Sequence, residues 1–432
     1  MIALSQNKKR VYYLVLFIFL KGFIASIIGF EEIMNVFADI CVFYLAYKVS
    51  KSSSIQLKYI LGKKLVVLIN LFFFIGIVSA FVNFIPIPTI LWGVRMFVRY
   101  FLLLYVVACT FHKSDIEWIR NFMYNIFKWN TFACLYQLYI YRTGDWMSGI
   151  THNNGELAIL MVVFDLFFSM EYFMGRMTKY SLIYRFLITI FIAMWAEIKF
   201  LYFVLPLCIY SSYVLAKKTN FVNVLVLVIA SLFFVPTMKY ILSFYYSDEY
   251  IEKTFDTDEI VKETSHDRYN LAAEGVSFNR NTCIEKTNEL FLYDPLHYAI
   301  GWGIGSGTNS GRFKTWIGFQ HEQTAYFFFT SSYVLLETGW LGYLTFLLIY
   351  VFIMLRFLYY YVMYKDQQSR FWSSFAIALC GFTFLFIWYN DTPYAYYYIP
   401  FVIWAFCFVA ISRHNPIRKS ELYEERTCIP ND

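Results

Sequence analysis

The stretch KKLVVLINLFFFIGIVSAFV, residues 63–82, decides the fold class, because its two lysines precede eighteen residues without a charged side chain. A helix of about 20 apolar residues crosses a bilayer core of roughly 30 Å. The whole chain of 432 residues shares this character, being 59% hydrophobic, 22% aromatic and only 15% charged. Soluble domains average about 45–50% apolar and about 25% charged residues. We therefore expect a polytopic membrane protein, and the composition excludes a disordered chain, a nucleic-acid binder and a disulfide-stapled secreted domain.

Similar apolar runs predict an all-α protein with about twelve transmembrane helices. The first run, from Val11 to Phe30, is too long and too charged at Lys21 for a cleaved signal peptide. No repeat or linker divides the chain, so residues 1–432 are expected to form a single membrane domain. The twelve spans are expected to begin near Val11, Ile33, Leu65, Ile90, Ile119, Glu156, Tyr180, Phe200, Phe221, Gly339, Phe371 and Tyr396.

The connectors between these runs alternate in charge. Lysines and arginines recur in every second connector, as in residues 48–64, whereas the connectors around residues 31–32, 86–88 and 390–391 are nearly free of them. Short basic connectors mark the cytoplasmic side of a membrane. Both termini, including a tail over residues 413–432, are therefore predicted to be cytoplasmic.

One large outer loop is predicted between spans nine and ten, over residues 246–338. Residues 248–322 contain thirteen acidic and seven basic residues, a net charge of −6, whereas the rest of the chain has seventeen acidic and twenty-nine basic residues. A connector of this length is usually functional or disordered. We expect it to form a cap over the membrane domain, with the aromatic stretch from Tyr326 to Leu336 lying as an interfacial helix on the membrane surface.

Charged residues inside the predicted spans are candidates for function, because burying a charge in a bilayer is costly. Arg95 and Arg99 share one helix face at i and i+4. Their partner is expected to be either Asp165 or a lipid-linked phosphate that reaches down from the outer side. Lys21 and Asp39, in the first two spans, are expected to pair structurally.

Two outer segments carry polar groups. Trp195-Ala-Glu197-Ile-Lys199-Phe200 places a carboxylate and an amine two residues apart, facing a cavity or each other, although a lysine at a helix end also snorkels without function. The segment from His152 to Glu156 has the pattern of a capped helix start, and its amides and carboxylate equally suit a sugar site.

Glycines alternate in Gly301-Trp302-Gly303-Ile-Gly305-Ser-Gly307, which permits either an anion-binding nest or a tight surface turn. No strand–helix context supports a dinucleotide fingerprint. The segment His321-Glu322-Gln-Thr-Ala325 lacks the second histidine of a zinc protease motif. The eight cysteines are scattered, so neither a disulfide framework nor a zinc site is expected, and no cofactor is predicted.

Several of these motifs occur in a set order: His152-Asn153-Asn154, a cation at Lys199, Arg280, Asp294-Pro295, the alternating glycines, and Glu337-Thr-Gly339-Trp-Leu-Gly342. In this order and sidedness the chain resembles the superfamily of O-antigen polymerases and O-antigen ligases from Asn154 onward. Many members carry His-Asn about nine residues before the Glu-x-Gly, where this chain has Phe328 and Phe329, and His321 lies about two helical turns earlier.

The resemblance implies a GT-C-like enzyme of the bacterial inner membrane that transfers sugars, with inversion and without a metal, from undecaprenyl diphosphate at the periplasmic face. Arg280, Lys199, Arg95 and Arg99 would bind the diphosphate, since arginine forks suit phosphate. The catalytic base would be His321 or Glu322, with Glu197 or His152 in reserve. The sugar-binding candidates are His152, Asn154 and Trp302.

Within this superfamily we favour the polymerase, which joins undecaprenyl-diphosphate-linked repeat units, over the ligase, which moves finished polymer to the lipid A core. The expected partners are glycan donor and acceptor, membrane lipid and a chain-length regulator protein, with no nucleic acid. From another class, a lipid-linked-sugar flippase or other transporter would show two repeated halves, and nine spans before the loop with three after it do not. A membrane O-acetyltransferase would need a histidine deep in a span, and no histidine lies at such a position in the predicted spans.

Overall fold

The structure is a computed structural model. It describes residues 6–52, 57–142, 144, 146–216, nine single positions between 236 and 255, and residues 278–308 and 313–411. The predicted ninth span, which begins near Phe221, and the predicted tail over residues 413–432 lie outside the described residues.

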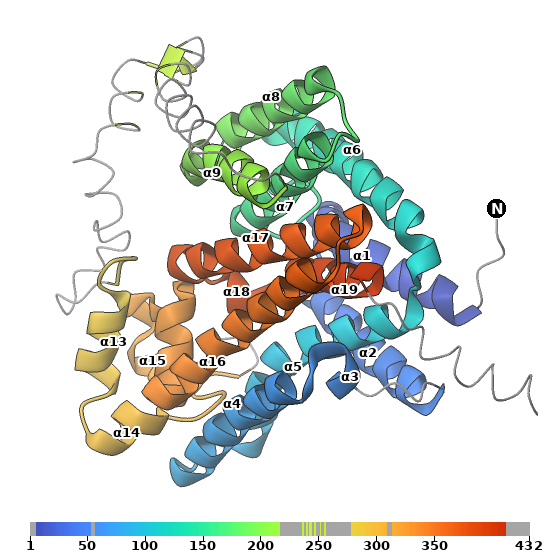
Figure 1. Ribbon diagram of the computed structural model, residues 1–432. Helices are drawn as coiled ribbons and strands as arrows, with labels where there is room; N and C mark the ends of the chain where they lie inside the picture. Colours follow the sequence, from blue (N-terminus) through green and yellow to red (C-terminus); the bar gives the residue numbers. More distant parts are fainter. Residues whose placement is uncertain are drawn as a thin grey trace, which may run out of the picture.

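The described residues form an all-helical bundle without a β-strand (Figure 1). The long helices are α1 (Gln6–Ile28), α2 (Glu31–Ser52), α4 (Lys63–Val82), α5 (Ile87–Thr110), α6 (Ile116–Tyr141), α7 (Asn154–Phe173), α8 (Lys179–Trp195), α9 (Lys199–Ala216), α16 (Thr330–Met363), α17 (Gln367–Tyr389) and α19 (Tyr398–Ile411). The short ones are α3 (Leu57–Leu61), η1 (Lys113–Asp115), α13 (Cys283–Phe291), α14 (Pro295–Ile300), α15 (Trp316–Gln320), η2 (Glu322–Thr324), η3 (Tyr326–Phe328) and α18 (Thr392–Ala395).

Helices lie at every predicted span position that the structure describes. Among them, 7 are long and apolar enough to cross a membrane: α1, α2, α4, α5, α9, α16 and α17. They indicate a multi-pass membrane protein. Of the others, α8 has 17 residues and α19 has 14, while α7 carries three acidic residues. Large apolar side chains also face outward on the spanning helices, such as Phe74 at 65% exposure and Leu91 at 64%, as lipid-facing positions require.

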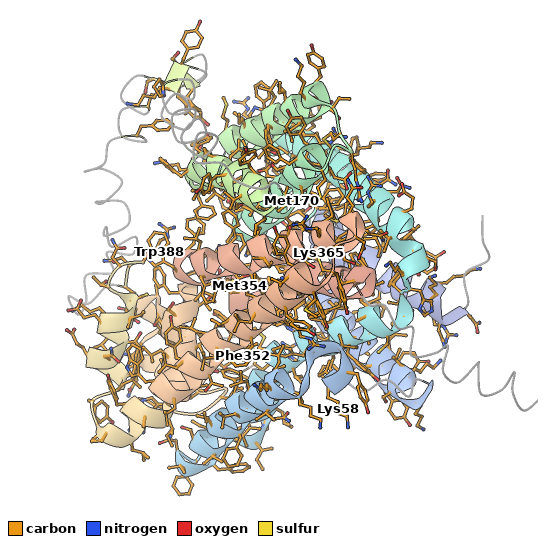
Figure 2. All side chains as sticks on the ribbon, in the orientation of Figure 1. Lys58, Met170, Phe352, Met354, Lys365 and Trp388 are labelled. Carbon is orange, nitrogen blue, oxygen red and sulfur yellow. The ribbon has the colours of Figure 1, made fainter. Side chains whose placement is uncertain are left out.

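Short turns arrange the helix ends into two opposite sets. Gly29 and Phe30 join α1 to α2, and a turn ending at Pro86 joins α4 to α5, so each pair runs up and down. Figure 2 shows Lys58 and Lys365, from basic connectors, toward one end of the bundle and Trp388 toward the other. The latter end carries residues 278–308 and 313–329, which we call the cap. The side of the membrane that each end faces stays a prediction.

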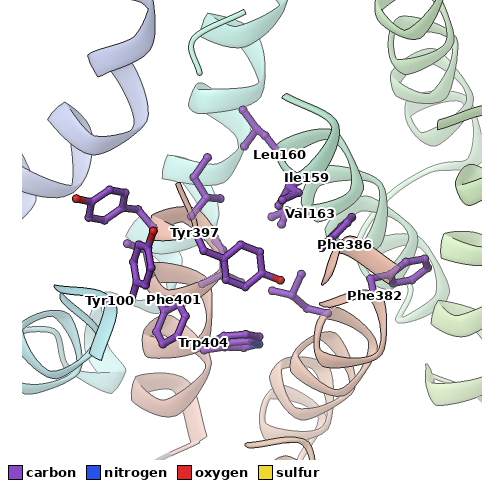
Figure 3. Close-up of a cluster of buried hydrophobic side chains, with 14 of the residues drawn as sticks. Tyr100, Ile159, Leu160, Val163, Phe382, Phe386, Tyr397, Phe401 and Trp404 are labelled. Atoms are coloured by element: carbon purple, nitrogen blue, oxygen red, sulfur yellow. The ribbon is translucent and has the colours of Figure 1, made fainter. Parts of the chain in front are cut away.

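Helix α7 lies at the centre of one half of the bundle and is buried along its length from Glu156 to Glu171. It packs against α8, α9 and α17. Beside it, aromatic rings from α5 and α19 fill the core, with Tyr100, Tyr397, Phe401 and Trp404 in edge and stacked contacts (Figure 3). Such aromatic packing fixes the positions of helices where the surrounding lipid supplies no hydrophobic driving force.

Helix α16 is longer than its predicted span and begins directly after the cap. It runs from Thr330 and kinks at Gly339, whose φ of 60° lies in the left-handed region. Residues 330–339 are all buried. The prediction of one interfacial helix from Tyr326 to Leu336 on the membrane surface is therefore wrong, because residues 330–336 are buried at the start of α16 and Tyr326–Phe328 form the separate helix η3.

Candidate functional site

The loop between α17 and α18, which we call the 389–392 turn, is where segments distant in sequence meet. Arg280 of the cap donates a hydrogen bond from Nε to the carbonyl oxygen of Tyr389 at 2.9 Å. Its guanidinium lies over the Tyr389 ring, 4.6 Å from the ring centroid. Phe200, which follows Lys199 at the start of α9, stacks on the same ring at 4.2 Å. Tyr389 thus joins the cap to α9 and α17.

The predicted His152–Glu156 segment reaches the same turn. Asn153 caps α7 by accepting from the backbone N–H of Glu156 at 2.7 Å, and the Glu156 carboxylate accepts from the N–H of His152 at 2.9 Å. The helix-cap interpretation is thereby confirmed for Asn153 and Glu156. Asn154 instead donates from Nδ2 to the carbonyl of Ala196 at 2.7 Å, between α8 and α9. Gly155 lies so close to the Asn390 side chain that an added Cβ would be 2.4 Å from Nδ2.

His152 lies beside a carboxyl group that the sequence analysis did not select. Its ring is 4.2 Å from the ring of Tyr396. Burial raises the pKa of Asp391, in the 389–392 turn, to about 6, although His152 acts in the opposite direction. Asp391 keeps part of its surface exposed while protein surrounds it on most sides. A carboxyl group with this pKa exchanges protons readily near neutral pH, which is what a general base needs.

Glu197 and Lys199 lie in the short connection from α8 to α9. Glu197 has a φ of 52°, which turns the chain sharply, and its side chain is exposed. It interacts electrostatically with Tyr246, whose hydroxyl donates to the carbonyl of Met194 at 2.7 Å. Lys199, at the first position of α9, is half-buried beside Phe200 and hence near the 389–392 turn.

The alternating glycines form a nest, and a carboxylate of the chain itself occupies it. The N–H groups of Gly305 and Gly307 donate to Oε1 of Glu337 at 2.9 and 3.2 Å. The N–H of Gly303 donates to the Glu337 carbonyl at 2.7 Å, an oxygen that the kink at Gly339 removes from the helix ladder. The prediction of a nest is thus confirmed in its geometry, but the Glu337 side chain occupies it, and the alternative of a surface turn is wrong because the segment is buried. The result ties the cap to α16.

Trp302 belongs to the same segment, between Gly301 and Gly303. Its Nε1 donates to the carbonyl of Phe291 at 2.7 Å, and its ring stacks on His297 at 3.7 Å. His297 contacts the carboxylate of Asp294 and, through Nε2, the Asn83 side-chain oxygen at 2.8 Å. Hydrogen bonding to His297 lowers the pKa of Asp294. These contacts join α14 to the end of α4.

The predicted bases His321 and Glu322 lie in the cap between α15 and η2. The His321 ring meets the Phe291 ring edge-on at 4.9 Å. Glu322 forms an ion pair with Lys314 at 2.5 Å and is exposed. Trp302 and His321 thus both contact Phe291. Arg280 contacts the 389–392 turn, while His152, Asn154 and Lys199 lie on segments that reach it through Gly155 and Phe200.

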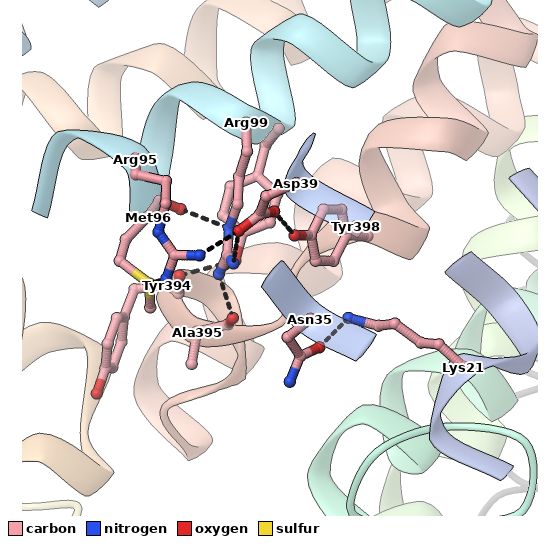
Figure 4. Close-up of polar contacts among 10 residues, drawn as sticks. Lys21, Asn35, Asp39, Arg95, Met96, Arg99, Tyr394, Ala395 and Tyr398 are labelled. Atoms are coloured by element: carbon pink, nitrogen blue, oxygen red, sulfur yellow. Dashed lines mark hydrogen bonds and ion pairs between the residues drawn. The ribbon is translucent and has the colours of Figure 1, made fainter. Parts of the chain in front are cut away.

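Arg95 and Arg99 share the carboxylate of Asp39 on α2 (Figure 4). Asp39 also accepts from the hydroxyl of Tyr398, and Arg99 donates to the carbonyl of Ala395 at 2.5 Å. Arg99 and Asp39 are each 3% exposed, whereas Arg95 is 19% exposed.

Two expected pairings inside the spans are therefore wrong. Asp165 does not pair with Arg95 or Arg99 and instead accepts from the hydroxyl of Thr189 at 2.9 Å. Lys21 does not pair with Asp39: it donates to Asn35 at 2.6 Å and lies over the Tyr398 ring at 4.4 Å. Asp39 binds the arginines because α2 packs against α5, a contact that sequence distance alone could not give.

Within the described ranges, no group of three or more His, Cys, Asp or Glu residues is placed to hold a metal ion. Compared with protein-family models, the chain matches none. Compared with curated protein sequences, it has no significant match.

Proposed function

We propose that the protein is a polysaccharide polymerase that joins oligosaccharide repeat units carried on undecaprenyl diphosphate, by inverting and metal-independent transfer at the outer face of a bacterial inner membrane. The proposal includes twelve spans in a GT-C-like arrangement, with cytoplasmic termini and a chain-length regulator as partner. It rests on the resemblance of the sequence motifs to O-antigen polymerases and ligases.

One structural observation supports the proposal most. Arg280 of the cap, Gly155 at the start of α7 and Phe200 at the start of α9 come from three regions separated in sequence, yet each lies against Tyr389 or Asn390 of the 389–392 turn. A site for a lipid-linked diphosphate needs fixed cations near the end of the helices, where the lipid tail can stay in the bilayer. A cation, an imidazole and a carboxyl group around one turn supply the parts of such a site.

The reaction would proceed as a single displacement. The acceptor hydroxyl attacks the anomeric carbon of the donor sugar, the bond from that carbon to the diphosphate oxygen breaks, and the configuration inverts. The hydroxyl proton passes to a base, for which Asp391, two residues after the Tyr389 that Arg280 contacts, and His152 are the candidates. Arg280 and Lys199 stabilise the departing diphosphate, a role worth about 3–4 kcal/mol per donor in other enzymes.

The test uses a strain deleted for this gene, complemented with the full chain, and a gel of its surface glycan. For a polymerase, deletion leaves a lipid core bearing one repeat unit and removes the ladder. A bare core without any repeat unit would contradict the proposal. Lipid-linked polymer accumulating outside would then indicate a ligase, and single units accumulating inside would indicate a flippase.

The site is tested in the same strain. Arg280→Ala should abolish the ladder while the protein still inserts. Lys286→Ala is the matched control, because Lys286 lies on α13 of the same cap in an exposed pair with Glu289, and it should restore the full ladder. A normal ladder with Arg280→Ala would remove Arg280 from the site.

A further inference from the structure

Helices α7, α8 and α9 enclose a buried carboxylate that the proposed function does not use. Asp165 of α7 is 1% exposed. Its Oδ1 accepts from Thr189 of α8, but its Oδ2 is buried and has no hydrogen-bond partner among the described residues. Such an oxygen is costly to bury, and a charged residue at this depth marks a functional position by default.

Two serines near Asp165 also have a buried oxygen without a hydrogen-bond partner among the described residues. Ser169 lies one helical turn further along α7, and Ser212 lies on α9. Both are 0% exposed, and neither hydroxyl oxygen has a hydrogen-bond partner within the part of the chain that the structure describes. Most buried hydroxyls in native proteins are bonded, so three unsatisfied oxygens on two packed helices need an explanation.

The register of the helices places these oxygens at matching depths. Because α8 runs back between two short turns, α7 and α9 are parallel, and the bond from Asn154 to Ala196 shows that they start side by side (Figure 1). With a rise of 1.5 Å per residue, Asp165 lies roughly 16 Å along α7. Cys208 lies at a similar depth on α9, and the Asp165 carboxylate acts on it electrostatically. Ser169 and Ser212 follow one turn deeper.

No cation within the described part of the chain neutralises this carboxylate. Among the described residues Asp165 has no ion pair, and the nearest basic residue on α8 points elsewhere: the Arg185 guanidinium lies over the rings of Phe168 and Tyr124 and donates to the carbonyl of Ser181 at 2.8 Å. A carboxylate accompanied by threonine and serine hydroxyls on packed helices suits a hard ion of single positive charge.

We propose that Asp165, Ser169, Thr189 and Ser212 bind a sodium ion between α7, α8 and α9. The site offers few oxygen ligands, and a low coordination number favours the smaller sodium ion over potassium. The ion would neutralise Asp165 and link the three helices whose ends carry Asn154 and Lys199. This inference does not depend on the proposed function.

The test measures thermal unfolding of the purified full-length protein in detergent. Sodium chloride replaces N-methylglucamine chloride at constant ionic strength, so that only sodium binding changes. A ligand that binds only the folded state raises the melting temperature as its concentration passes the dissociation constant, here by a few degrees. Potassium should give a smaller shift at equal concentration.

Variants of the proposed ligands test where the sodium ion binds. Asp165→Asn keeps the shape of the side chain and removes its charge, so it should abolish the sodium-dependent shift. The double variant Ser169→Ala/Ser212→Ala should weaken the apparent sodium affinity at least tenfold, and it tests the site even where Asp165→Asn fails to fold. Asp366→Asn alters an acid whose carboxylate caps α17 by accepting from the N–H of Ser369 at 2.9 Å, and it should keep the full shift.

Three outcomes would overturn the proposal. The wild-type protein could show no sodium dependence and instead lose stability as the pH rises, which would mean that Asp165 carries a proton. The shift could persist in Asp165→Asn, or it could be unchanged in the double serine variant. Either result would place the ion elsewhere.

Discussion

The Arg95–Arg99 cluster and the 389–392 turn are both built on arginine, yet they differ in how the chain encloses the charge. In the first, Asp39 lies between two guanidinium groups and is 3% exposed. In the second, Arg280 and Asp391 are both partly exposed at the end of the bundle. An ion pair enclosed by protein holds helices together, whereas accessible charges at a turn can bind a ligand. The comparison predicts that changes in the first region affect stability and that changes in the second affect activity.

The largest effect is expected for Asp39→Ala. Removing this carboxylate leaves Arg99 buried without its counter-charge, which costs about 3–5 kcal/mol in other proteins. We expect low yield and a lower melting temperature in detergent. Asp115→Ala is the control, since Asp115 pairs with Lys8 near the opposite end and remains partly exposed. Equal stability of the Asp39→Ala and wild-type proteins would show that the cluster does not hold α2 to α5.

Arg280→Ala should affect activity and leave stability nearly unchanged. Activity should fall about 100- to 1000-fold, as for the loss of one transition-state donor in other enzymes, while the melting temperature changes little. Arg280→Lys should recover only part of the activity, because lysine cannot form the planar stacked contact with Tyr389. Polymer length on gels and thermal unfolding of the same preparations measure the two effects separately.

A third pair of variants tests the enclosure of Glu337 by the glycines. At Gly303, which has a φ of 99°, an added Cβ would lie 2.2 Å from the backbone of Ala80. Gly303→Ala should therefore destabilise the protein by about 3 kcal/mol through overpacking and backbone strain.

Gly381→Ala is the matched control in α17, where an added Cβ meets nothing within 4 Å. It should be neutral or stabilising by up to about 1 kcal/mol, the difference in helix propensity. Similar melting temperatures for the two alanine variants would mean that the cap is not fixed to α4 through Gly303.

A small stabilising effect is expected for Asp391→Asn. Because the pKa of Asp391 is raised to about 6, the folded state favours the protonated carboxyl, so stability is full below the ordinary value of 3.8 and is lost as the pH rises through 6. Asparagine removes this loss and should stabilise the protein at pH 7 by about 1 kcal/mol, after a discount for solvent exposure.

The activity of the wild-type protein should depend on pH in the opposite direction to its stability. If Asp391 is the base, wild-type activity rises as the pH passes 6, and Asp391→Asn is inactive at every pH. A pH profile of polymer formation in membranes measures this. An active variant with an unchanged profile would return the role of base to His152 or His321.

Sequence patterns predicted the helices better than their contacts. Apolar runs located every described span position, because hydrophobic length is a local property. The partners of Arg95 and Lys21 were missed because they depend on which helices pack together. Asp391 was missed because one acid in a short connector carries no signal, although its place in a connector without lysine or arginine put it at the right end. The glycine nest was predicted, but the side chain that occupies it, Glu337, belongs to the same set of motifs and was assigned no role there.

The burial of α7 has a consequence for how the protein is made. Glu156, Asp165 and Glu171 lie on a helix whose neighbours are protein on every side. On insertion scales, an acid near the middle of a helix costs about 2.5–3.5 kcal/mol. We expect α7 to partition poorly into lipid when it leaves the ribosome alone and to enter only with its flanking helices. During membrane insertion and folding, α7 would then be among the last helices to reach its final position, although it is central in the folded bundle.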